Sequence, residues 1–159
     1  MPTVLTEAHY GAVLNFFYFL LLDEGLALNA AYKATKIAQK KLVEIEPAQA
    51  DRVLISVMSG LFHKYKKHHR TLHSVLQPPK SDWKTPNRDY LGAWKEYMRR
   101  STDDSPETLV LHYVLNYPIS TISKGLEIPE GTLYFRIGRG LENFSHGSFL
   151  QSAPTGAKK

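Results

Sequence analysis

Apolar residues recur three and four positions apart along most of this chain, and that spacing is typical of one face of an α-helix. The pattern begins at Leu5 and continues to Leu42 with an interruption at residues 23–25, which predicts an αα-hairpin. It returns in segments at residues 48–76, 89–100, 106–116, 119–126 and 129–144. No segment shows the alternation of apolar and polar residues that a half-buried strand requires. The spacing therefore predicts an all-α fold.

A proline-rich segment, "QPPKSDWKTPN" at residues 77–87, divides these helical segments into two groups. It has no consistent period, as is typical of a linker. We therefore predict an N-terminal helical bundle, a linker with a short helix, a C-terminal helical domain and a disordered tail, at residues 1–76, 77–105, 106–145 and 146–159. Whether the two halves pack together stays open, because a linker of this kind permits either arrangement.

Charge and composition narrow the class of protein. The 159 residues carry a net charge of +5, and residues 63–100 hold ten Lys and Arg against three Asp and Glu. That balance favours an anionic partner without identifying it. The apolar run at residues 13–22 is shorter than the roughly 20 residues of a membrane-spanning helix, and no Lys or Arg precedes it. We expect a soluble, cytoplasmic protein with no membrane contact.

The sequence offers no constellation for catalysis. The chain has no cysteine, which excludes disulfides and thiolate zinc sites. Asp103 and Asp104 are adjacent, but helix capping explains them better than acid-base work. Gly138 and Gly140 lie inside a helical pattern, so they do not form a phosphate-binding loop. They indicate either close helix packing or a bent helix. We expect neither enzyme activity nor a cofactor.

Histidines gather in and after the basic run "HKYKKHHR" at residues 63–70: His63, His68, His69 and His73. Imidazoles one helical turn apart can bind a metal ion. However, no carboxylate or thiol lies beside them in the sequence, and the neighbouring lysines repel cations. We therefore expect no metal site. The run itself can either follow a phosphate backbone or form a solvated, basic helix end.

The segment "YPISTISKGLEIPEGTLYFRIGRGLENF" at residues 117–144 has the spacing of a helix-turn-helix. Ile119, Ile122 and Leu126 form the apolar stripe of a first helix, and Leu133 and Ile137 that of a second. In such a unit the N-terminal residues of the second helix reach base edges in the major groove. The outward residues are Glu130, Thr132, Tyr134, Phe135, Arg136 and Arg139. Spacing alone fits an ordinary helical hairpin equally well.

The stretch "LVLHYVLNYPISTISKGLEIPEGTLYFRIGRGLENF" resembles region four of bacterial sigma factors of the extracytoplasmic-function type, with Gly131, Thr132, Leu133, Arg136 and Arg139 in register. The stretch "DRVLISVMSGLFHKYKKHHR" at residues 51–70 is similar to the last long helix of region two in the same family. The opening "LTEAHYGAVLNFFYFLLLDEGLALNAAYKATKIAQKKL" similarly looks like its first two helices.

This resemblance implies two helical domains without catalytic residues, which bind RNA polymerase core and promoter DNA and have a potential anti-sigma partner. The DNA-binding residues that it implies are Thr132, Tyr134, Phe135, Arg136 and Arg139 at the distal promoter element, and Lys64, Lys66, Lys67 and Arg70 near the proximal one. The polymerase-binding residues are Asp23, Asn29, Tyr32, Lys33 and Lys36.

Several positions depart from the family pattern. Asn29, Tyr32 and Lys33 stand where the family carries acid and Gln, Glu127 replaces the turn glycine, and Tyr134 and Phe135 stand where Lys and Ser are common. These departures keep a second hypothesis open. In it, the chain is a sigma-like scaffold that acts as a protein-interaction or regulatory module, without promoter-specific initiation.

Overall fold

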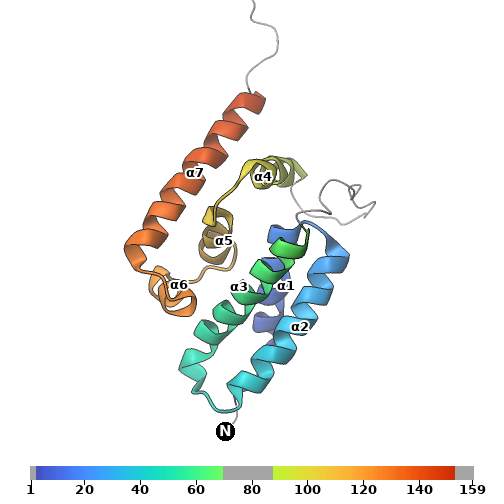
Figure 1. Cartoon of the computed structure of the whole chain (residues 1–159), viewed down its shortest axis with the longest axis vertical. Coiled ribbons are helices and arrows are strands. Elements are labelled where there is room, and N and C mark those ends of the chain that lie inside the picture. Colours follow the sequence, from blue (N-terminus) through green and yellow to red (C-terminus); the bar gives the residue numbers. More distant parts are fainter. Residues whose placement is uncertain (1–2, 70–87, 153–159) are drawn as a thin grey trace, which may run out of the picture.

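The structure is a computed structural model that describes residues 3–69 and 88–152 (Figure 1). Within these ranges every regular element is a helix, and there is no strand. The all-α prediction is therefore confirmed. The proline-rich segment at residues 77–87 and Arg70 lie outside the described residues.

The N-terminal half is a bundle of α1 (Glu7–Leu21), α2 (Glu24–Leu42) and α3 (Ala50–His69), with a short 3₁₀ turn, η1 (Pro47–Gln49), before α3. Thr6 begins α1 with a capping box, and Asp23 caps α2. The buried face of α2 is rich in alanine, which lets α1 and α3 pack close to it. Figure 1 shows these helices side by side, in blue to green.

The C-terminal half consists of α4 (Arg88–Arg100), α5 (Ser105–Leu109), a π-helical turn η2 (Val110–Val114), α6 (Ile119–Leu126) and α7 (Glu130–Ser152). The short helix predicted inside the linker is present as α4. The first and last residues of α6 agree with the prediction. In contrast, α7 continues to Ser152, past the predicted end near Phe144, so the residues that follow Phe144 extend the helix.

The two halves pack together, which answers the question that the sequence left open. Helix α6 packs along α3, η2 contacts α1, and the buried apolar residues of both halves form one continuous core. Helix α4 joins this core from the other end: Trp94 Nε1 donates a hydrogen bond of 2.7 Å to the carbonyl oxygen of Phe19 at the end of α1. The rings of Tyr97 and Phe144 then connect α4 to α7, with centroids 5.8 Å apart.

The two glycines of α7 have different surroundings. A Cβ at Gly140 would lie 2.9 Å from Leu109 Cδ1 and 3.1 Å from Tyr97 Oη, so α7 approaches α4 and α5 closely there. A Cβ at Gly138 would meet nothing within 4 Å. Close packing therefore explains Gly140, but not the exposed Gly138.

Candidate nucleic-acid interface

Helices α6 and α7 are joined by a tight turn at residues 127–129. Glu127 ends α6 in the left-handed region, at φ 56° and ψ 42°. The Ser123 hydroxyl donates a hydrogen bond of 2.6 Å to the carbonyl oxygen of Ile128, and the Ile128 N–H donates one of 3.1 Å to the carbonyl oxygen of Ser123. These bonds fix the angle at which α7 leaves α6.

The two faces of α7 are clearly distinguished. Leu133 and Ile137 are buried in the core, as the sequence predicted. Tyr134 and Phe135 point outward with 60% and 66% of their surface exposed, and Thr132 is exposed beside them. The first turns of α7 are therefore free to contact another molecule, and they present aromatic rings rather than positive charge.

The two arginines of α7 have acidic partners in their own chain. Arg139 Nε lies 3.2 Å from Asp103 Oδ2, and Arg136 Nη2 lies 3.7 Å from Asp104 Oδ2. Asp103 Oδ1 also accepts a hydrogen bond of 2.9 Å from the Ser105 N–H. Burial opposes ionisation of Asp103, but this hydrogen bond and the Arg139 charge outweigh it, so the pKa of Asp103 lies below its usual value.

Asp104 brings the two predicted DNA-binding clusters together. Lys66 Nζ, at the end of α3, lies 3.8 Å from Asp104 Oδ1, on the same carboxylate that Arg136 contacts. Lys64 and Lys67 are exposed on either side of Lys66. The resemblance assigns these clusters to two separate promoter elements, whereas here they share one aspartate.

The residues predicted to bind polymerase lie on α2. Asn29, Tyr32, Lys33 and Lys36 are all exposed, and their spacing places them on one face of the helix. Lys36 Nζ lies 4.5 Å from the centroid of the Tyr32 ring. Asp23 has a structural role as well, because its carboxylate accepts a hydrogen bond of 2.8 Å from the Leu26 N–H and so caps α2.

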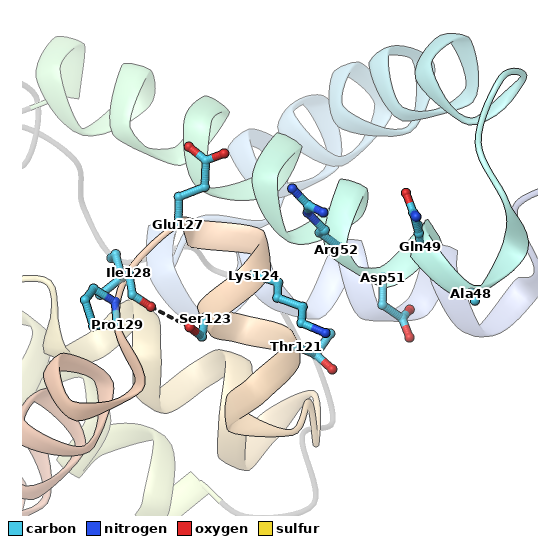
Figure 2. A pocket seen from close by; sticks show the side chains of 10 residues that line it. All are labelled: Ala48, Gln49, Asp51, Arg52, Thr121, Ser123, Lys124, Glu127, Ile128 and Pro129. Atoms are coloured by element: carbon cyan, nitrogen blue, oxygen red, sulfur yellow. Dashed lines mark hydrogen bonds between the residues drawn. The ribbon is translucent and has the colours of Figure 1, made fainter.

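An open pocket of about 660 Å³ lies where the start of α3 meets α6 and the turn (Figure 2). Arg52 comes from α3, Lys124 from α6, and Glu127 from the turn. Asp51 adds a second carboxylate. The lining therefore mixes both signs of charge and favours no single class of ligand.

Sequence reasoning missed an ionic contact between the halves. His63 Nε2 on α3 lies 3.1 Å from Glu107 Oε2 on α5, and the Glu107 side chain is buried. Hydrogen bonding to Glu107 raises the pKa of His63 above its usual value, although burial of the ring opposes this. No carboxylate lies beside the histidines in the sequence, since Glu107 is 44 positions away from His63.

No protein-family model matches the chain, and no match was found among curated proteins. Within residues 3–69 and 88–152, none of the helices has both the length and the apolar character needed to cross a membrane.

Proposed function

We propose that the chain is a divergent sigma-factor-like transcription protein that binds promoter DNA through α6 and α7 and RNA polymerase core through α2. The observation that carries this proposal is the helix-turn-helix geometry. Leu133 and Ile137 anchor α7 in the core, while Thr132, Tyr134 and Phe135 remain exposed on its first turns. The N-terminal part of the second helix is the part that reads bases in proteins of this kind.

The ion pairs of Arg136 and Arg139 are compatible with DNA binding. The carboxylates of Asp103 and Asp104 are 31% and 39% exposed, so solvent screens their pairs with the arginines. Exposed pairs of this kind contribute little stability, and a DNA phosphate can take the place of each carboxylate. We infer that binding exchanges Asp103 and Asp104 for phosphates.

The shared contact at Asp104 has a further consequence for this mechanism. Lys66 and Arg136 cannot reach two distant promoter elements while both contact the same carboxylate. Full promoter binding therefore requires the two halves to separate, with α6 leaving α3. The described arrangement corresponds to a closed form of the protein.

Copurification with RNA polymerase core, followed by reconstituted transcription from a library of promoter fragments, tests the proposal. We expect association with core and initiation from a subset of the fragments. The double variant Tyr32→Ala with Lys36→Ala removes two predicted polymerase-binding side chains from the exposed face of α2, and it should weaken the association with core. No association, together with no initiation from any fragment, would contradict the sigma-like function.

A second candidate function is a protein-interaction module on the same scaffold. The specific observation in its favour is that Tyr134 and Phe135 are more than half exposed, whereas Arg136 and Arg139 have intramolecular partners. Exposed aromatic residues are typical anchors of protein interfaces. An anti-sigma protein is one partner that the resemblance implies. The double variant Tyr134→Ala with Phe135→Ala distinguishes the two functions. Its DNA affinity should fall if α7 binds DNA, and should equal that of the unmodified chain if α7 binds only a protein partner.

A further inference from the structure

A histidine of the N-terminal half lies close to two carboxylates of the C-terminal half. They are His63 of α3, Asp104 immediately before α5, and Glu107 within α5. One ligand atom from each lies within 4.8 Å of the others. Imidazole nitrogen and carboxylate oxygen are both common zinc ligands.

Glu107 gives an independent reason to look for a cation here. Its exposed fraction is 2%, and its Oε1 atom is buried without a hydrogen-bond partner among the described residues. A buried carboxylate is unfavourable unless its charge and its oxygens are compensated. His63 reaches only Oε2, at 3.1 Å, so the second oxygen of the same carboxylate remains uncompensated.

We propose that His63, Asp104 and Glu107 bind a divalent transition-metal ion of the Zn²⁺ type. Two ligands on a tetrahedral zinc ion lie about 3.3 Å apart when their bonds are about 2.0 Å long, and the His63–Glu107 distance of 3.1 Å fits this spacing. Asp104 is 39% exposed, so its side chain has room to turn toward the ion. Water completes the coordination. The histidine nitrogen disfavours Mg²⁺ and Ca²⁺, which prefer oxygen ligands.

The neighbouring cations set the affinity of this site. Lys66 and Arg136 both contact Asp104, and each competes with a metal ion for that carboxylate. Metal binding displaces them, and it cross-links α3 to α5 and so holds the two halves together. Metal binding therefore releases Lys66 and Arg136, which are two of the predicted DNA-binding residues. Replacing Lys66 with Ala removes a competitor and should tighten metal binding.

Titration of the metal-stripped full chain with Zn²⁺, in competition with a chromophoric chelator, tests the site. We expect one tight equivalent, and an affinity at least tenfold weaker in His63→Ala and in Glu107→Gln. Mg²⁺ and Ca²⁺ should not compete. His146→Ala, which alters an exposed histidine of α7, is the matched control and should bind as the unmodified chain does. Zn²⁺ should also raise the Tm of the unmodified chain but not that of His63→Ala.

Metal binding by the histidine run that follows His63 would contradict the proposed site. If the tight equivalent survives in His63→Ala and disappears in His68→Ala with His69→Ala, the metal binds the run and the proposed site is wrong. Absence of a tight equivalent in the unmodified chain overturns the proposal equally, and His63 and Glu107 then form an ion pair only. Because Glu107→Gln alters a buried residue, Asp104→Asn at the surface serves as a second variant, with the fold of each checked by circular dichroism.

Discussion

Gly125 of α6 lies directly on Ile55 of α3. A Cβ at position 125 would come within 2.7 Å of both Cβ and Cγ2 of Ile55, and within 3.2 Å of the carbonyl oxygen of Arg52. No side chain fits in that space. Helix α6 therefore rests on the N-terminal bundle at a distance that only glycine allows at this position.

Replacing Gly125 with Ala should destabilise the protein by about 1–3 kcal/mol, because the added methyl group must push α6 away from α3. Gly60→Ala is the matched control, since a Cβ at this exposed position inside α3 meets nothing within 4 Å. That change should stabilise the helix by up to about 1 kcal/mol. Urea unfolding followed by circular dichroism measures both. Equal effects of the two changes would show that α6 does not pack on α3 as described.

The glycines of α7 give a second matched pair. Gly140→Ala should destabilise the protein by about 1–3 kcal/mol, because its methyl group meets Leu109, Ser105 and Tyr97. Gly138→Ala should be neutral or stabilise by up to about 1 kcal/mol, since the position is exposed and helical. Thermal unfolding compares them. A stabilising Gly140→Ala would be inconsistent with the close approach of α7 to α5.

Glu127→Gly should stabilise the protein by about 1 kcal/mol, because glycine adopts the left-handed conformation of this turn without the steric cost that a side chain carries. Glu130→Gly is the control: it introduces glycine into the first turn of α7, where it should not stabilise. Chemical unfolding of both variants measures the difference. A destabilising Glu127→Gly would mean that the Glu127 side chain makes an interaction that outweighs the backbone cost.

Stability should fall in alkaline solution. Burial raises the pKa of Tyr97 and of Tyr117 to about 12, with smaller contributions from the charges of Asp103 and Asp51 respectively. The ordinary pKa of tyrosine is about 10. Because the folded pKa is the higher one, this contribution to stability is complete below pH 10 and is lost as the pH rises through 12.

Unfolding at fixed urea concentration, measured from pH 8 to pH 12, tests this expectation alongside the absorbance of ionised tyrosine at 295 nm. Tyr97→Phe and Tyr117→Phe should each reduce the slope of stability against pH above pH 10. Exposed Tyr134→Phe is the control and should leave that slope unchanged. Ionisation of every tyrosine near pH 10 while the fold persists would contradict the burial of Tyr97 and Tyr117.

Local patterns in the sequence were sufficient to predict where most of the helices lie. The three-and-four spacing predicted the break between α1 and α2, the bounds of α6 and the buried face formed by Leu133 and Ile137. The break lies at residues 22 and 23 and so begins one residue before the predicted interruption at 23–25. The predicted end of α7 near Phe144 was wrong, since the helix continues to Ser152. The polar and small residues after Phe144 lack an apolar stripe, so their spacing did not indicate a helix.

Contacts between distant residues were beyond the same reasoning. Local spacing predicts neither the pair Arg139–Asp103 nor the pair His63–Glu107, because the partners are far apart in the sequence. Arg139 and Asp103 meet through packing within the C-terminal half, and His63 and Glu107 meet through packing of the two halves. Asp103 illustrates this limit. The prediction that it satisfies the helix start is supported by its bond to the Ser105 N–H, but its contact with Arg139 required the position of α7.

The central claim, that α7 contacts DNA, is tested most directly by the salt dependence of DNA binding. The affinity of the full chain for promoter fragments is measured by fluorescence anisotropy between 50 mM and 200 mM salt. Arg136→Ala with Arg139→Ala should weaken binding and reduce the slope of log affinity against log salt by about 1 for each phosphate that the variant no longer neutralises. Lys40→Ala with Lys41→Ala removes the same charge from the exposed end of α2 and should change neither quantity. Unchanged affinity and slope in the arginine variant, or an equal reduction in the lysine control, would contradict the claim.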